Sequence, residues 1–154
     1  MQENQHLETF KATAQGNGWP TTVTISNTEW TLQLDEPEEG GGSNSGPNPM
    51  QYFAASLAGC QNEQARVVAD ELSLTIGKID ISLEIDLDLA GFMGTAASSD
   101  GSYKEVRLNA VVHGNISSEL VQTLGNSVDS RCPILGLLRT SGCNIHSSWS
   151  TFQS

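Results

Sequence analysis

The sequence predicts an α+β domain built from antiparallel sheets and a long central helix. Three observations support this: strand-like runs near the start, a helical period from Pro49, and a strictly alternating segment from Lys78. The predicted order is three strands, a long helix, two long strands, two helices and a strand, which is typical of an α+β domain. A chain of 154 residues is expected to form one domain, residues 1–154, around a single core.

The N-terminal part is predicted to be a small sheet followed by a loop. Residues 1–6 are polar and expected to be frayed. Runs rich in Thr, Val, Ile and Trp over 7–14, 21–27 and 30–35 are separated by turn residues, which indicates a three-stranded antiparallel meander. The stretch 35–49 is rich in Gly, Pro and acidic residues, so we expect a loop, long enough to line a site.

A helical period begins at Pro49 and continues to about Leu72. Steps of three and four residues define its expected packed face: Met50, Phe53, Leu57, Cys60, Gln64, Val67 and Glu71. Another side of the helix carries only small side chains, so a second element could approach it closely: Ala54, Ala55, Ala58 and Gly59. At 1.5 Å per residue the helix would be roughly 33 Å long, which makes it the central element.

Residues 78–89 alternate strictly between apolar and polar side chains, and residues 103–114 repeat the pattern. The two segments therefore predict a long hairpin with one face in the core and the other in water. The polar face carries a row of acidic residues. We interpret this row as a solvated sheet face rather than a metal site, with Arg107 as a cross-strand partner.

The C-terminal part is predicted to contain two helices and a strand. Ser117 offers an N-cap for a helix that ends near Ser130. Pro133 begins a short helix that Ser141 and Gly142 end, and residues 144–152 alternate as a final strand.

The composition indicates a soluble, acidic protein. The formal charge of −11 and the pI near 4.4 argue against a nucleic-acid or anionic-membrane partner, because both require a basic surface. No apolar run reaches the roughly 20 residues of a membrane span, and the N-terminus lacks the pattern of an export signal. We therefore expect a cytoplasmic protein whose three cysteines are reduced thiols at rest, and we expect no cofactor.

Two cysteines lie in segments that suit a working thiol. Cys60 lies inside a helix of small residues, and Cys132 lies at a turn just before Pro133. A thiolate that attacks an oxidant, together with a second thiol that traps the product as a disulfide, can carry out a complete two-electron reduction. A cysteine on an apolar helix face is also a common inert core residue, so structural thiols stay an alternative.

Residues 40–60 and 128–135 resemble segments of the OsmC/Ohr superfamily of thiol-dependent peroxide reductases, and the resemblance extends from about residue 7 to about residue 152. It implies an OsmC-like fold and an intertwined homodimer with sites at the interface. It also implies that Cys60 is the reactive thiol and Cys132 the resolving thiol, that the substrate is a hydroperoxide, and that a cellular dithiol resets the disulfide. Two positions differ: Met50 stands where these peroxidases have Glu, and residues 15–19 lack their Arg.

A reactive Cys60 needs a cation to stabilise its thiolate, and Arg131, beside Cys132, is our choice over Arg66 and Arg139. The alternative function, from a different class, is a non-catalytic OsmC-like protein that binds an apolar small molecule at the dimer interface. This pocket would be lined by Met50, Tyr52, Phe53 and Leu57.

Cys143 and His146 form a Cys-x-x-His motif, but residues i and i+3 of a strand point to opposite faces. We therefore predict no metal site there.

Overall fold

The computed structural model describes residues 7–152, and the chain divides into two compact units at Tyr52 and Phe53. Residues 1–6, which we expected to be frayed, lie outside the described residues, as do residues 153–154. The expectation of one domain over 1–154 stays a prediction. None of the helices within 7–152 is both long and apolar enough to cross a membrane.

The first unit contains the predicted meander. Strands β1 (Ala12–Gln15), β2 (Thr21–Ile25) and β3 (Thr31–Leu34) pair antiparallel in the order β1-β2-β3. The first strand begins at Ala12 instead of Leu7. It cannot begin earlier because its partner strand β2 ends at Ile25, which pairs with Ala12.

The loop that follows is organised by the buried carboxylate of Asp35. Its oxygens accept hydrogen bonds from the backbone N–H groups of Ser43 and Ser45, at 3.1 and 2.9 Å, and from both hydroxyls at 2.7 Å. These bonds hold the pKa of Asp35 well below its ordinary value. Gly42 is required here, since an added Cβ would lie 2.6 Å from the Asp35 carboxylate. The loop also contains a 3₁₀ turn, η1 (Glu38–Gly40), which we did not predict.

Helix α1 (Pro49–Glu71) begins at the predicted residue and ends one residue before Leu72. A reciprocal capping box fixes its start: Gln51 N–H donates to the Asn48 side chain, and Asn48 N–H donates to the Gln51 side chain, each at 2.9 Å. Pro49 occupies the first helical position, where its missing N–H costs nothing.

The predicted packed face of α1 is partly wrong. Val67 is 41% exposed and Glu71 is also exposed, whereas the residues that are buried follow a neighbouring stripe: Leu57, Gln61, Ala65, Val68 and Ala69. Hydropathy misses this stripe because one of its members is a glutamine and two are alanines, which score weakly as core residues.

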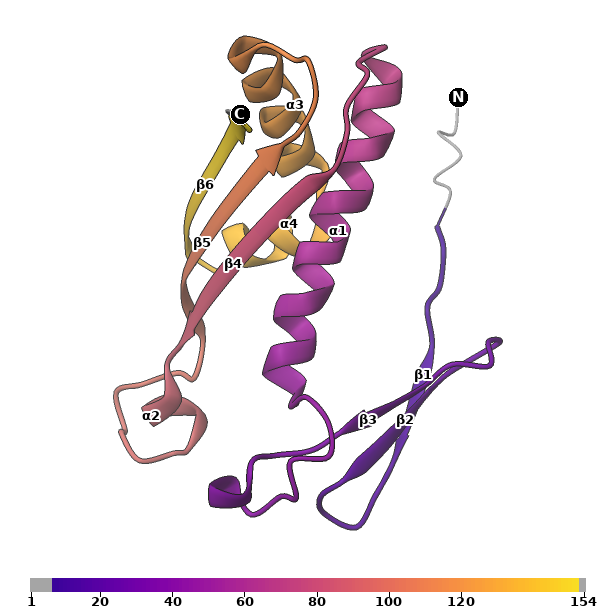
Figure 1. Cartoon of the computed structure of the whole chain (residues 1–154). Helices are drawn as coiled ribbons and strands as arrows, with labels where there is room; N and C mark the ends of the chain where they lie inside the picture. The colour runs from indigo at the N-terminus through magenta and orange to yellow at the C-terminus, as the bar shows by residue number, and fades with distance from the viewer. Residues whose placement is uncertain (1–6, 153–154) are drawn as a thin grey trace, which may run out of the picture. The chain divides into compact units, whose positions relative to one another are not determined.

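The second unit contains the predicted hairpin. Strands β4 (Ile79–Leu87) and β5 (Tyr103–Val112) pair antiparallel, and β6 (Asn144–Thr151) joins β5 in parallel, so the order is β4-β5-β6. Figure 1 shows β5 as the middle strand. The turn between β4 and β5 contains one unpredicted helical turn, α2 (Leu89–Phe92), capped by Asp88.

Two helices connect β5 to β6. Helix α3 (Ser118–Arg131) begins after the predicted cap, Ser117, and α4 (Pro133–Thr140) follows it directly. One apolar core draws on α1, β4, β5, α3, α4 and β6. Helix α3 lies so close to β6 that an added Cβ on Gly125 would meet the Trp149 indole.

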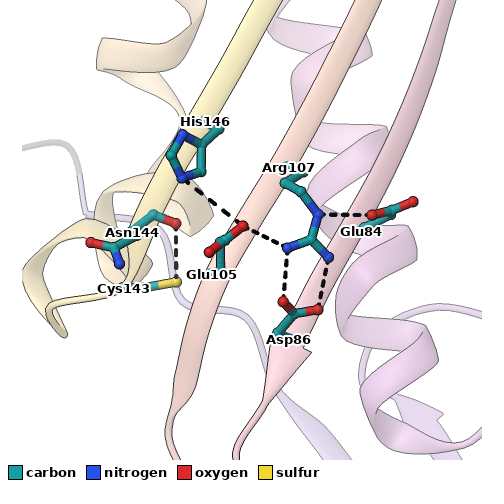
Figure 2. A network of polar contacts seen from close by, with 7 residues as sticks. All are labelled: Glu84, Asp86, Glu105, Arg107, Cys143, Asn144 and His146. Carbon is teal, nitrogen blue, oxygen red and sulfur yellow. Dashed lines mark hydrogen bonds and ion pairs between the residues drawn. The ribbon is translucent and has the colours of Figure 1, made fainter.

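On the polar face of this sheet, Arg107 is the cross-strand partner that we predicted. Its guanidinium binds Glu84 and Asp86 on β4 and Glu105 on its own strand, with N···O distances of 2.7–2.8 Å (Figure 2). All four side chains are exposed or partly exposed. Surface pairs of this kind contribute little to stability, which fits a solvated sheet face.

Candidate thiol site

The structure brings together the two cysteines singled out in the sequence. Cys60 lies on α1, and Cys132 lies between α3 and α4, 72 positions along the chain. Their Sγ atoms are 3.1 Å apart. This separation exceeds the roughly 2.05 Å of a disulfide, so the two residues are free thiols in direct contact.

The N-terminus of α4 faces both sulfurs. Cys132 is the N-cap of this helix, and its Sγ accepts from Leu135 N–H at 3.5 Å. The backbone N–H of Ile134, in the first turn of α4, lowers the pKa of Cys60. Helix N-termini stabilise thiolates. The Cys-Pro sequence at a helix start was the signal for this arrangement, because Pro favours the first helical position.

Burial is the largest influence on Cys60, and it raises the pKa of this thiol well above its ordinary value. The contact with Cys132 and the charge of Glu63 raise the pKa further, while the Ile134 N–H lowers it. At neutral pH Cys60 is therefore a thiol at rest.

Arg131 is engaged elsewhere. Its guanidinium binds the carboxylate of Glu71 at 2.5 and 3.1 Å, and it is not among the main influences on the pKa of Cys60. Arg139 donates to the backbone carbonyl of Asp129 at 3.3 Å. The thiolate-stabilising role of Arg131 thus gains no geometric support and stays a prediction.

The four predicted pocket residues have different surroundings. Leu57 is fully buried in the core, and Phe53 stacks on Tyr103 with ring centroids 4.9 Å apart. In the first unit, Met50 is partly buried, and the phenol of Tyr52 donates to the Gln33 carbonyl at 3.3 Å. The pocket that they were expected to line at a dimer interface stays a prediction.

Cys143 and His146 do not converge. The Cys143 thiol contacts the Asn144 carbonyl at 3.7 Å, while His146 is oriented toward Glu105, at 4.0 Å (Figure 2). Burial, followed by the charges of Glu105 and Asp86, raises the pKa of Cys143. In the part of the chain that the structure describes, no group of three or more His, Cys, Asp or Glu side chains could hold a metal ion.

A hollow of about 730 Å³ lies on the polar face of the second sheet, around Arg107 and His146. Neither thiol lines it. The hollow is therefore separate from the candidate thiol site.

Gln61, the residue that follows Cys60, was not among the predicted site residues. Its side chain is completely buried, and neither amide atom has a hydrogen-bonding partner within residues 7–152. A buried amide normally finds partners. The one available signal was its place next to the candidate thiol, which hydropathy does not weigh.

Comparison with known proteins agrees with the fold. Residues 41–148 match the family described as OsmC-like protein. An organic hydroperoxide resistance protein OsmC from Legionella pneumophila has a TM-score of 0.73 and 24% identity, covering 95% of this chain and 98% of that one. An OsmC-like protein from Mycoplasma pneumoniae has a TM-score of 0.79 and 18% identity, with coverage of 94% and 99%.

The organic hydroperoxide resistance protein OhrB of Bacillus subtilis is 26% identical, with a TM-score of 0.64 and coverage of 92% and 97%. Among curated proteins, no sequence matches this one. The family match covers well over half of the 154 residues. The chain therefore belongs to the OsmC-like protein family.

Proposed function

We propose that this protein is a thiol-dependent hydroperoxide reductase that works through Cys60 and Cys132. The observation that supports it best is the 3.1 Å contact between two free thiols that are 72 positions apart in the sequence. Once the hydroperoxide has oxidised one of the two sulfurs, only a small approach of the other is needed for a disulfide to form. The solved structures named as hydroperoxide resistance proteins share the fold and add to this support.

Cys60 is the thiol that meets the oxidant, because it is partly exposed whereas Cys132 is 1% exposed. The Cys60 thiolate attacks the distal oxygen of the hydroperoxide. The O–O bond breaks, an alkoxide leaves and is protonated to the alcohol, and sulfur is oxidised to the sulfenic acid. Cys132 then attacks this sulfur, an S–S bond forms, and water leaves. A cellular dithiol reduces the disulfide and restores both thiols.

The first step requires a proton to leave Cys60, and burial opposes this. The N-terminus of α4 acts in the other direction through the Ile134 N–H. The balance favours the thiol, so the reaction at neutral pH is slow and speeds up as the pH rises.

We further propose that the working form is a cytoplasmic homodimer. Gly59 lies on the small-residue side of α1, is exposed, and has no atom within 4 Å of an added Cβ among the described residues. A surface of small side chains allows a second helix to approach closely.

The test adds one equivalent of tert-butyl hydroperoxide to the reduced protein, counts the remaining thiols and identifies the linked peptides. We expect the loss of two thiols, slow at pH 7 and faster as the pH rises, and a Cys60–Cys132 disulfide. Cys132→Ser should stop at a sulfenic acid that dimedone traps on Cys60. The matched control, Cys143→Ser, should form the same disulfide as the wild type. Retention of all three thiols by the wild type would exclude the reductase.

The second candidate function is binding of an apolar small molecule without catalysis. The raised pKa of Cys60 and the engagement of Arg131 by Glu71 favour it, since both leave the thiol poorly activated. A binding protein would keep its thiols under stoichiometric hydroperoxide, so the same experiment separates the two functions.

A further inference from the structure

The side chain of Gln61 carries an amide that the described residues leave without a hydrogen-bonding partner. The side chain is fully enclosed. Both its donor, Nε2, and its acceptor, Oε1, are without a partner in the range 7–152. Burial of an unpaired amide is unfavourable, so this position fits a partner from outside the chain better than a purely structural role.

Gln64 provides a second atom of this kind. Its Oε1 is also buried and unpaired within the described chain. Gln64 lies four residues beyond Cys60 and three beyond Gln61, and residues at these spacings are neighbours on a helix. Gln64 is thus a helix neighbour of both Cys60 and Gln61, and this segment of α1 supplies a thiol, an amide donor and two amide acceptors.

We propose that the Gln61 amide binds the hydroperoxide that reacts at Cys60, with Nε2–H donating to the oxygen that leaves. This inference rests on the proposed function and deepens it by naming the group that recognises the peroxide. The substrate therefore has two adjacent oxygens. One accepts a hydrogen bond from the amide N–H, and the other carries an O–H that donates a hydrogen bond to an amide oxygen.

The chemistry explains why a neutral donor helps here. When sulfur bonds the distal oxygen, the electron pair of the O–O bond moves to the other oxygen, which becomes an alkoxide. A donor placed at that oxygen stabilises the charge as it develops. The hydroperoxide O–H remains on the transferred oxygen and becomes the O–H of the sulfenic acid. The Oε1 atom of Gln61 or Gln64 can accept it throughout. A neutral amide also leaves no unpaired charge in the core.

The test treats the reduced wild type and the reduced Gln61→Met variant with two reagents. Methionine has a shape similar to that of glutamine but no amide. Tert-butyl hydroperoxide should oxidise the variant about tenfold more slowly, as expected for the loss of one neutral hydrogen bond. Iodoacetamide should alkylate both proteins at the same rate, because its iodide leaves without a donor. The melting temperature should not fall, since the variant buries no unpaired amide.

Gln122→Met is the matched control. The Gln122 amide donates to the Trp149 carbonyl, so its loss should lower the melting temperature and leave both reaction rates unchanged. If Gln61→Met does not fold, Gln61→Leu replaces it, because leucine also lacks the amide and has a different side-chain shape.

Three results would overturn the inference. Equal hydroperoxide rates for the wild type and the Gln61 variant would exclude the amide as a donor while leaving the proposed function intact. An equal fall with both reagents would show that Gln61 governs access to the thiol and not the peroxide. A wild type that does not react with the hydroperoxide would exclude the proposed function and the inference together.

Discussion

Replacement of Gly125 by alanine should destabilise the second unit by overpacking α3 against β6. An added Cβ would lie 2.3 Å from Cγ, 2.5 Å from Cδ1 and 2.8 Å from Cδ2 of the Trp149 indole. These atoms are at the base of a rigid ring that is only 4% exposed. The ring cannot move away without displacing the core, so the helix or the strand must shift.

Two opposing effects set the size of the loss. Overpacking of a filled core costs about 1–3 kcal/mol, and alanine is about 1 kcal/mol more favourable than glycine inside a helix. The new Cβ would lie roughly 1 Å inside ordinary van der Waals contact, which places the cost at the upper end of the range. The expected net loss is about 2 kcal/mol, or a fall of roughly 4–8 °C in melting temperature.

The assay is thermal unfolding followed by circular dichroism at one fixed protein concentration, because association would otherwise shift the transition. Gly136→Ala on α4 is the matched control. No atom lies within 4 Å of its added Cβ among the described residues, so it should gain about 0.5–1 kcal/mol. A Gly125→Ala protein that melts at or above the wild-type temperature would refute the packing argument.

Three further predictions follow from the structure. The pKa of Asp35 lies below its ordinary value of 3.8, so in acid this group binds fewer protons in the folded protein than in the unfolded one. The ionised carboxylate therefore stabilises the loop above pH 3.8, and this stabilisation is lost as the pH falls below that value. Asp35→Asn should therefore speed amide exchange at Ser43 and Ser45 at pH 7 and flatten the acid dependence, and unchanged exchange would contradict this. Because burial raises the pKa of Cys60, alkylation of this thiol should rise about tenfold per pH unit from pH 7 to 8.5, and a plateau below pH 7 would show an activated thiolate. Sedimentation at micromolar concentration should give about twice the chain mass of 16.4 kDa; a stable monomer would exclude the interfacial pocket.

The sequence by itself determined the longer helices and strands, because the signals for them are local, whereas the short turns η1 and α2 were not predicted. Strict alternation over residues 78–89 identified β4, since a strand repeats every two residues. The change to a period of three and four residues at Pro49 identified α1 to within one residue of its end. The same reasoning located both C-terminal helices and the final strand, because caps and turn residues act over only a few positions.

The motif of each cysteine was also visible in the sequence. The small-residue helix around Cys60 and the Cys-Pro turn at Cys132 drew attention to both thiols, and the resemblance to a known superfamily paired them. No local pattern could do so, because residues 72 positions apart meet only through the packing of whole elements.

Tertiary structure decided the environment of the thiols. Arg131 is adjacent to Cys132 in sequence, yet its charge is taken by Glu71, which lies 60 positions earlier. The buried stripe of α1 includes Gln61 instead of Val67, because close packing depends on which side of the helix the core approaches and not on hydropathy alone. Burial and partner charge set the pKa of Cys60, and both arise only when distant segments come together.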